Sequence, residues 1–574
     1  MSSMRLRHVK TLIAPFLALF FAGHISFALA QEAVKPGPYL AGRYAEKEND
    51  FRAAGAWYAR ALIADKENPY LIESSLLALI ASGGFGMAAD KAAYLVEANI
   101  ESQSAVLMHF AALAQAQEFD AILALLDQGV TSNPLMDQLF KAWAQMGKGD
   151  SGLAMQSFEV LAKSPKLAPI GMYHKALALA YAGDFESAEA MISNSVAGQV
   201  ELGRNSVVAY VQILSQLNRN SDALALLDRN FPQHRDPLMD VLRLQLHTGE
   251  AMPFVLVANP TQGMGEAFFT LAYALNNEAE DQITLLYGRL ATYLNPNNTQ
   301  AHLMVAHLLD NLGQYDLAYE AYRAISADDP ASYQAELGRA NALDAQGNVE
   351  AALEVLRSLV LRHPDLTMVH LTLADMLRRQ KYFEKAISAY DAAEKTLISG
   401  APQNWVLYYG RGISHEQSSQ WDKAEADFNH ALVLVPDQPQ VLNYLGYSYI
   451  DRNENLTEAL AMIERAVHKQ PDNGYIVDSL AWGLYRLGRY QDALPHMERA
   501  ALSEPVDPIV TDHLGDIYWA VGRKLEAQFQ WRRALSFNPT ESDADRIRSK
   551  LELGLDGVLA EEGAPALHVI ANGQ

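Results

Sequence analysis

The chain has 574 residues, half of them apolar, and a formal net charge of −23 at pH 7. This length admits several domains or one long array, and this apolar content excludes a disordered chain. The acidity argues against general nucleic-acid binding and against polybasic contact with anionic lipid. Cysteine is absent, which excludes disulfides, thiolate metal sites, a cysteine nucleophile and lipid attachment through cysteine.

Residues 1–30 have the pattern of a secretory signal peptide. The basic stretch MSSMRLRHVK precedes the apolar run TLIAPFLALFFAG, and an A-x-A cleavage motif ends at Ala30, before Gln31. A retained membrane anchor is the alternative, but the run is shorter than the roughly 20 apolar residues that span a bilayer. Cleavage would remove three basic residues and no acid, so the formal charge would change from −23 to −26. We therefore expect an exported protein in the periplasm of a Gram-negative bacterium.

Helical hairpins with small residues at regular spacing are predicted for residues 31–249. The spacing is clear around Ala54, Ala154 and Ala188, and it is blurred between residues 69 and 135. The glycines of GGFGMAAD fall in the blurred part. They predict a turn rather than a phosphate-binding loop, since no strand pattern precedes them and no Lys-Ser/Thr follows.

The segment 250–264 interrupts the helical pattern. With its flanking residues it reads GEAMPFVLVANPTQGMG, which contains two prolines, three glycines and a short β-branched run. Such a composition disfavours the second helix of a hairpin. We predict an irregular junction between two solenoid segments, and the sequence leaves open whether this junction is a hinge.

Residues 265–541 carry the strongest internal repetition. One alanine recurs in steps of 34, 34, 38, 35, 34 and 34 residues. Its positions are Ala318, Ala352, Ala386, Ala424, Ala459, Ala493 and Ala527. Another small residue precedes each alanine by 12 or 13 positions, a large residue follows by four, and a proline closes most units. A period of this length is typical of stacked helical hairpins.

Each unit is predicted to form two closely packed helices. Apolar residues recur three and four positions apart in each half, and a turn such as RLGRY, with Gly488, separates the halves. Two helices approach to about 8–10 Å only where the side chains at the crossing are small. We therefore expect Ala481 and Ala493 to face each other across one hairpin, with bulky residues around them.

This repeat resembles the tetratricopeptide repeat. The residues that carry the resemblance in two of the units are Leu445, Gly446, Tyr449, Ala459, Ala466 and Pro471, and Leu514, Gly515, Tyr518, Ala527, Ala534 and Pro539. The resemblance implies an all-α fold, a right-handed superhelical solenoid of antiparallel helix pairs. Residues 31–249 would then be divergent tetratricopeptide-like repeats, and residues 265–541 the tetratricopeptide array proper.

The region from LNYLGYSYIDRNENL to RRALSFNP is similar to a narrower group as well. It resembles exported bacterial tetratricopeptide adaptors that present cell-wall hydrolases to a carboxyl-terminal processing protease. That resemblance implies a scaffold that brings a periplasmic protease and its substrates together. Those adaptors are lipoproteins, however, and this chain has no cysteine that could carry a lipid.

A capping helix is predicted for residues 542–555. Thr540, or the serine two positions later, can cap its start, and Ile547 and Leu551 share one face while the other face is charged. A terminal repeat needs such a polar lid because its apolar face would otherwise contact water. The tail, residues 556–574, is expected to be disordered.

No motif for catalysis or metal binding is found in the sequence. It has no H-E-x-x-H, no G-x-S-x-G and no Walker loop, and its 16 histidines are scattered. We predict a protein that is not an enzyme, that needs no cofactor and that binds no metal.

The first helices of the repeats line the concave side of such a solenoid, and they supply the candidate protein-binding residues. These residues are Tyr409, Asn443, Tyr447, Tyr475, Asp478, Trp482, Tyr485, Arg486, Asp512, Asp516 and Trp519. Aromatic side chains with polar tips suit a groove for an extended peptide or a partner helix, and burial between repeats is the alternative. The inner positions hold no lysine to clamp a terminal carboxylate, and Asp478 and Asp512 would favour a cationic or neutral segment.

The predicted function is that of a non-enzymatic exported adaptor or scaffold that binds other proteins in the concave groove. A structural component of a cell-envelope or polysaccharide-export assembly is the alternative. The expected partners are proteins, with a periplasmic protease and its substrates implied by the narrower resemblance. Nucleic acid and a lipid anchor are not expected.

Overall fold

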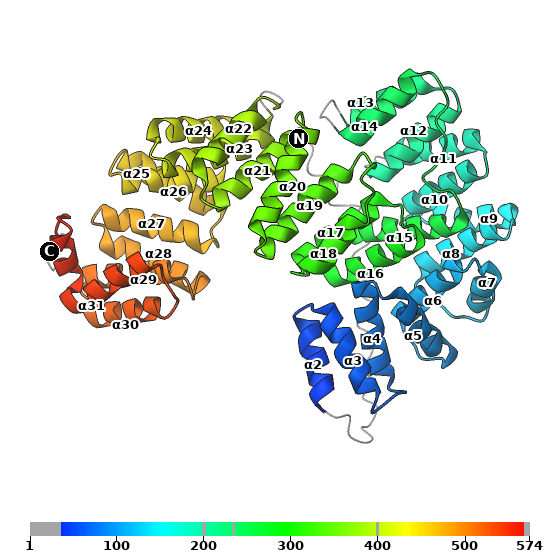
Figure 1. The fold of residues 1–574 in the computed structure, drawn as a ribbon, viewed down its shortest axis with the longest axis horizontal. Coiled ribbons are helices and arrows are strands. Elements are labelled where there is room, and N and C mark those ends of the chain that lie inside the picture. Colours follow the sequence, from blue (N-terminus) through cyan, green and yellow to red (C-terminus); the bar gives the residue numbers. More distant parts are fainter. Residues whose placement is uncertain (1–35, 198–202, 232–235, 398–400, 568–574) are drawn as a thin grey trace. The chain divides into compact units, whose positions relative to one another are not determined.

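A computed structural model describes residues 36–197, 203–231, 236–397 and 401–567. Over these ranges the chain forms thirty α-helices, α2 to α31, one 3-10 turn, η1, and no strand. The predicted all-α fold of paired helices is therefore confirmed (Figure 1). The predicted signal peptide, with its cleavage site at Ala30 and Gln31, lies outside the described residues.

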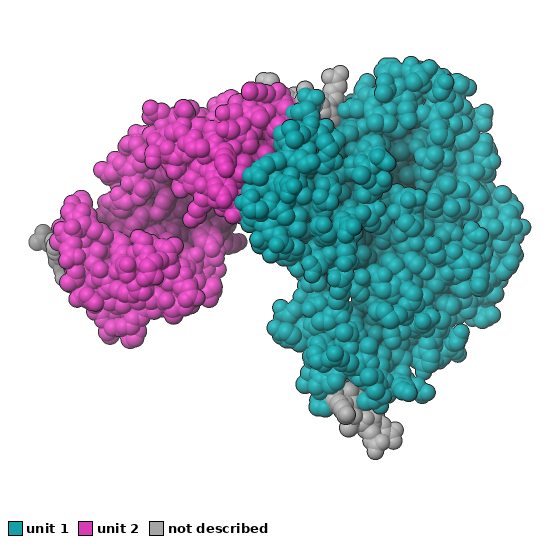
Figure 2. Space-filling view, viewed as in Figure 1, with its two compact units in different colours: residues 1–365 teal, residues 366–574 magenta. Residues whose placement is uncertain are grey.

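The chain divides into two compact units, residues 1–365 and 366–574 (Figure 2). Unit 1 contains α2 (Pro36–Lys47), α3 (Phe51–Leu62), α4 (Pro69–Ser82), α5 (Phe85–Glu97), α6 (Gln103–Gln115), α7 (Phe119–Asp127), α8 (Pro134–Gly147), α9 (Ser151–Ala162), α10 (Ala168–Tyr181), α11 (Phe185–Ala197), α12 (Arg204–Gln216), α13 (Asn220–Asn230), α14 (Pro237–His247), α15 (Pro260–Leu275), α16 (Asp281–Leu294), α17 (Thr299–Asn311), α18 (Tyr315–Arg323), α19 (Ser332–Ala345) and α20 (Val349–Arg362). The boundary between the two units in the sequence thus follows Asp365, well beyond the junction predicted at 250–264.

Unit 2 consists of five helical hairpins and a last helix. Its elements are α21 (Thr367–Arg379), α22 (Phe383–Glu394), η1 (Pro402–Asn404), α23 (Trp405–Gln417), α24 (Trp421–Leu434), α25 (Pro439–Asp451), α26 (Leu456–Lys469), α27 (Gly474–Arg486), α28 (Tyr490–Ser503), α29 (Pro508–Ala520), α30 (Lys524–Leu535) and α31 (Glu541–Glu561). Consecutive helices of this series pack against each other, as the predicted stack requires.

Local sequence signals set the limits of the hairpins. Asn473 and Asp507 accept hydrogen bonds from backbone N–H groups in the first turns of α27 and α29, which satisfies donors that have no partner within the helix. The turn between α27 and α28 passes through Gly488 at φ 74°, a left-handed conformation that glycine adopts without steric cost. The turn predicted for RLGRY is therefore confirmed.

Small residues lie where the two helices of a hairpin cross. A Cβ atom on Gly446 would lie 2.9 Å from the carbonyl oxygen of Ala459 on the partner helix. In the next hairpin Ala481 and Ala493 are both fully buried, and α27 packs on α28. The sequence prediction that small residues permit these close crossings is confirmed.

A close approach between consecutive hairpins, of Gly171 on α10 to α9, leads to a stability prediction in unit 1. A Cβ atom at position 171 would lie 2.6 Å from the carbonyl carbon of Leu161 and in steric conflict with the backbone nitrogen of Ala162. Because backbone atoms cannot rotate away as side chains do, Gly171→Ala is expected to destabilise the protein by about 1–3 kcal/mol. Urea unfolding of the full chain measures this effect. Gly152→Ala, on α9 with open space around it, is the control and should leave stability unchanged or slightly raised.

Unit 1 departs from a simple open solenoid at α15 and α16. This hairpin packs against α4, α6, α8 and α10, the first helices of earlier repeats (Figure 1). A Cβ on Gly263 of α15 would lie 2.6 Å from the indole Cε2 of Trp143 on α8, and the Thr261 hydroxyl donates to the carbonyl oxygen of Ala114 on α6 at 2.8 Å. The inner side of the first array is therefore covered by the chain's own helices.

The predicted junction 250–264 is only partly irregular. Helix α15 begins at Pro260 because Asn259 caps it, accepting a hydrogen bond from the backbone N–H of Gln262, and because proline is compatible with the first helical turn. The segment without helix therefore ends at residue 259. The prolines and glycines that suggested a break instead mark the start of a helix and its close approach to α8.

The C-terminal helix α31 closes unit 2, as predicted, but it is longer than 542–555. Thr540 is its N-cap, accepting from the backbone N–H of Asp543 at 3.3 Å, and Ile547 is fully buried. The helix bends at Gly554 and continues to Glu561, so the expectation of a disordered tail from residue 556 is wrong for its first six residues. The buried side chains of Leu555 and Val558 explain the extension.

Candidate protein-binding site

The candidate residues all lie on first helices of unit 2. Tyr409 is on α23, Asn443 and Tyr447 are on α25, five of the residues are on α27, and Asp512, Asp516 and Trp519 are on α29. The structure separates them by exposure: Asp478, Tyr485, Asp512 and Asp516 are buried, Tyr475 and Arg486 are exposed, and the others are half-buried. The buried residues therefore pack between repeats, whereas the exposed and half-buried residues remain candidates for contact with a partner.

Trp482 is held in an aromatic stack that joins α27 to α29. Its ring lies 4.0 Å from the ring of His513 with an interplanar angle of 15°, and 4.7 Å from the ring of Tyr485 with an angle of 19°. The Nδ1 atom of His513 lies 2.9 Å from the Oδ1 atom of Asp478. Asp478 and Tyr485 thus serve to position Trp482, which keeps a partly exposed edge. Sequence reasoning missed His513, because repeat spacing does not distinguish a histidine that pairs with the preceding repeat.

The contact between Asp478 and His513 leads to a prediction about the pKa of His513, which should be higher than that of an ordinary histidine. Burial alone would lower the pKa of His513, but the charge and hydrogen bond of Asp478, with the charges of Asp512 and Asp516, together raise this pKa above its ordinary value of 6.5. The pair therefore stabilises the fold fully below about pH 6.5, and this contribution is lost as pH rises through the raised pKa. NMR titration of the full chain with labelled histidine measures the pKa, and His513→Asn assigns the signal. Asp478→Asn should lower the pKa of His513; an unchanged value would contradict the role of Asp478.

Asp512 and Asp516 face the capping helix rather than a partner. The Nζ atom of Lys550 on α31 lies 2.7 Å from Asp512 and 2.7 Å from Asp516, and the lysine side chain is fully buried. The indole nitrogen of Trp531 also donates to Asp516 at 3.0 Å. These two carboxylates therefore hold α31 in place, and the preference for a cationic partner segment that was expected from Asp512 has no free charge to support it.

Trp519 is likewise engaged by the end of the array. Its indole nitrogen donates to the Oδ2 atom of Asp556 at 2.9 Å, and its ring lies 5.3 Å from that of Trp531. A Cβ atom on Gly554 would lie 2.6 Å from this indole. The glycine at the bend of α31 therefore leaves room for the Trp519 ring. Trp519 belongs to the cap.

Four half-buried residues on successive first helices remain as candidates, and we call them the first-helix face: Tyr409, Asn443, Tyr447 and Trp482. Tyr409 and Asn443 occupy equivalent repeat positions, and so do Tyr447 and Trp482, one turn further along their helices. Burial and the nearby Asp478 raise the pKa of Tyr447 to about 12, which keeps its phenol neutral and able to donate. The Oδ1 atom of Asn443 is buried and accepts no hydrogen bond. This face offers aromatic area and neutral hydrogen-bonding groups.

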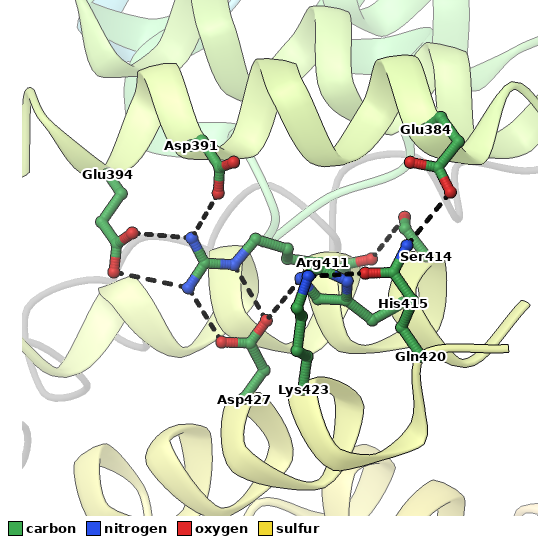
Figure 3. A network of polar contacts seen from close by, with 10 residues as sticks. Glu384, Asp391, Glu394, Arg411, Ser414, His415, Gln420, Lys423 and Asp427 are labelled. Carbon is green, nitrogen blue, oxygen red and sulfur yellow. Dashed lines mark hydrogen bonds and ion pairs between the residues drawn. The ribbon is translucent and has the colours of Figure 1, made fainter. Parts of the chain in front are cut away.

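A second polar cluster, around Arg411 on α23, is structural (Figure 3). The guanidinium donates to both carboxylate oxygens of Asp427 at 2.8 Å, to Glu394 at 2.6 Å and to Asp391 at 2.8 Å. These acids lie on α22 and α24, on either side of α23. Because the donors of Arg411 are directed at the chain's own carboxylates, the guanidinium is not available to bind a partner's phosphate or carboxylate.

The described parts of the chain hold no group of three or more histidine, aspartate or glutamate side chains placed to bind a metal ion. Among the helices of those same parts, none is long and apolar enough to span a bilayer.

Comparisons with known proteins agree on the type of repeat. Family models described as tetratricopeptide repeat match residues 311–376 and 391–540. A TPR repeat-containing protein of Pseudomonas aeruginosa is 32% identical over 148 residues, which is 26% of this chain and 24% of the relative. The chain thus spans about a quarter of the length of the curated relative that it matches.

Solved structures with similar folds are distant in sequence. The Cut9–Hcn1 hetero-tetramer of the APC/C is 14% identical, with a TM-score of 0.40, over 95% of this chain and 99% of that chain. Yeast Tom70 is 13% identical, with a TM-score of 0.34, over 92% and 98%. A tetratricopeptide repeat protein of Parabacteroides merdae is 17% identical, with a TM-score of 0.37, over 45% and 98%.

The assignment that follows rests on the repeat sequence and on the paired helices. The matched segments coincide with helical hairpins whose close crossings are formed by small residues. Residues 311–376 and 391–540 of this chain are tetratricopeptide repeats.

Proposed function

We propose that this protein is an exported adaptor that binds a segment of another protein on the first-helix face of unit 2. The observation that carries the proposal is the row of Tyr409, Asn443, Tyr447 and Trp482 on successive first helices, half-exposed and neutral. Tetratricopeptide repeats are in general protein-binding scaffolds, because stacked hairpins form an extended surface. Aromatic and amide side chains suit a peptide, whose backbone they can hydrogen-bond while its apolar side chains pack on the rings.

Export and the identity of the partner rest on the sequence alone. The pattern of residues 1–30 supports secretion to the periplasm. The resemblance of the C-terminal region to adaptors of carboxyl-terminal processing proteases supports a periplasmic protease or its substrate as the bound protein. Cell fractionation tests the first point, since the mature chain should be in the soluble periplasm, and recovery of the uncleaved chain in membranes would contradict it.

Site-specific photo-crosslinking tests the surface itself. A photo-crosslinking amino acid placed at position 447 of the full chain should capture one or two partners in the native cells. The matched control carries the same amino acid at position 502, where Leu502 on α28 is 81% exposed. Equal capture of the same proteins from both positions would show that the first-helix face has no special role.

The contribution of Trp482 can be measured with the captured partner. Trp482→Ala is expected to weaken binding by about tenfold or more, because a half-buried aromatic anchor at an interface typically contributes at least ~1.4 kcal/mol. Leu502→Ala is the control. Helical content and urea unfolding establish that both variants are folded. Unchanged affinity of a folded Trp482→Ala variant would remove the proposed site.

A further inference from the structure

Unit 1 contains a cavity of about 660 Å³ that is separate from the first-helix face. It is lined by residues of α10, α11, α12, α15, α17 and α19. This volume lies within the range of about 300–1,000 Å³ that is typical of ligand-binding pockets. The cavity exists because α15 packs beside α10 and is followed by the α17–α19 repeats, which leave a space opposite α12.

Glu266 forms part of the cavity wall and is unusual in its surroundings. Its side chain is buried, with the residue only 2% exposed, and it is the one charged residue of α15. Tyr173 donates to it at 2.9 Å, Asn205 at 3.2 Å and Asn298 at 3.4 Å. All three donors are neutral. A carboxylate buried among neutral groups pays a large desolvation cost unless a cation compensates it.

The remaining lining complements an elongated cationic ligand. Phe269, Tyr273 and Met304 supply apolar and aromatic surface for methylene groups and for cation–π contact. Side-chain amides, among them those of Gln300 and Gln334, can donate to and accept from a peptide backbone.

Arg204 and Lys166 are the described basic groups that line the cavity, and neither is among the groups that donate to Glu266. Arg204 also lines the cavity, but its guanidinium is engaged by both oxygens of Asp236 at 2.6 Å. Lys166 lines it too, yet the groups that donate to Glu266 are the neutral ones above. A ligand can therefore supply a counter-charge that the described donors to Glu266 do not.

We propose that this cavity, the Glu266 cavity, binds a guanidinium or ammonium group whose charge pairs with Glu266, delivered by a basic side chain of a peptide. The volume exceeds what one side chain fills, and the amides that line the cavity match the flanking peptide groups. The inference does not depend on the first-helix face, which is formed by other residues in the other unit.

The pairing has a pH signature. Burial raises the pKa of Glu266 to about 7, and the cation binds the ionised carboxylate. Affinity should therefore rise about tenfold between pH 6 and pH 8, with proton release at neutral pH. Tyr173, on α10, has its pKa raised well above 10 by burial. The phenol of Tyr173 therefore stays neutral over this interval, and burial lowers the pKa of His307, on α17, which disfavours its cationic form.

Isothermal titration calorimetry of the full chain with defined probes tests the proposal. The probes are acetyl-Ala-Arg-Ala-amide, the same peptide with uncharged citrulline in place of arginine, and free arginine amide. The arginine peptide should bind, at least tenfold more tightly than the citrulline peptide at pH 8. Two buffers of different ionisation enthalpy should reveal the proton release near pH 7. If free arginine amide binds as well as the peptide, the cation comes from a small molecule; if it does not, it comes from a protein segment.

Matched variants make the test specific to Glu266. Glu266→Gln should reduce affinity for the arginine peptide at least tenfold at pH 8 and abolish its pH dependence, and Glu250→Gln, on the exposed junction, should not. Tyr273→Ala removes a residue that is 48% exposed, which the fold tolerates, and it should also weaken binding. Trp482→Ala should leave this binding unchanged. Equal binding of the arginine and citrulline peptides, or no binding of either cation at millimolar concentration, would overturn the proposal.

Discussion

Replacing Lys550 with methionine is expected to destabilise the C-terminal end of unit 2 by about 3–5 kcal/mol, because it leaves the buried Asp512 without its lysine and leaves Asp516 with only Arg546, whose Nη1 atom is 3.8 Å away. Lys550 is fully buried and its Nζ atom lies 2.7 Å from both Asp512 and Asp516. Burial and the neighbouring Asp516 already raise the pKa of Asp512, against the opposing effect of Lys550. Without the lysine, at least one of the acids must take up a proton or move into water. Hydrogen exchange of α29 to α31 in the full chain, together with urea unfolding, measures the loss.

Two controls separate this charge effect from a general effect of altering α31. Lys524→Met removes a lysine from an exposed ion pair with Asp556, 3.7 Å long, and should change stability little, since exposed pairs contribute little. Adding Asp512→Asn and Asp516→Asn to Lys550→Met removes the uncompensated charges and should restore much of the stability. If Lys550→Met behaved like Lys524→Met, the buried pairing would not be what holds the cap.

The hairpins of unit 2 could be predicted from the sequence because their signals are local and periodic. The glycine of the RLGRY turn, the small residues Gly446 and Ala459 at one crossing, and the N-cap Thr540 each act within one hairpin or one helix end. Such interactions join residues close in sequence, and every repeat shows them again. The helical type of the blurred region 69–135 was also predictable from its apolar periodicity, although the repeat spacing was not.

Packing between segments distant in sequence could not be predicted in the same way. The α15–α16 hairpin covers the inner side of helices that lie several hairpins earlier in the sequence, and the contact of Gly263 with Trp143 follows no repeat period. The prolines and glycines of the junction were therefore interpreted as a break. One signal was present for Glu266, because a single charge in the otherwise apolar and polar helix PTQGMGEAFFTLAYAL indicates a buried or functional acid.

The candidate site shows the same division. Trp482 was identified from helical spacing, and it does lie on a first helix with part of its ring exposed. The acids were interpreted as surface charge because charged residues are seldom buried without a partner. Lys550 lies three residues after the buried Ile547, on the inner side of α31, and a lysine at that register was the one signal that the acids of the preceding helix had a partner.

Replacing Arg411 with methionine is expected to destabilise unit 2 by about 3 kcal/mol, the second large effect. The side chains of Arg411 and Asp427 are only 11% and 10% exposed and form two parallel hydrogen bonds of 2.8 Å. Loss of the guanidinium leaves the buried Asp427 with only His415, whose Nε2 atom lies 3.9 Å away and whose pKa is lowered by burial. Asp391 and Glu394 are 52% and 40% exposed, so water can solvate them and they add little to the cost. Urea unfolding of the full chain and hydrogen exchange of α22 to α24 measure the change.

A conservative variant of Arg411 and a variant at an exposed ion pair are the controls for this loss of stability. Arg411→Lys keeps the charge but cannot form two parallel hydrogen bonds to Asp427. Its free energy of unfolding should therefore lie between those of the parent chain and Arg411→Met. Arg465→Met breaks an ion pair whose partners are about half exposed and should have little effect. Although burial opposes it, Arg411 lowers the pKa of Glu394, so the contribution of that pair is present above about pH 4.5 and lost as pH falls through the lowered pKa. The part of the Arg411→Met effect that comes from this pair should accordingly be lost in acid. An Arg411→Lys variant as unstable as Arg411→Met would contradict the proposal that charge and paired hydrogen bonds to Asp427 carry the effect.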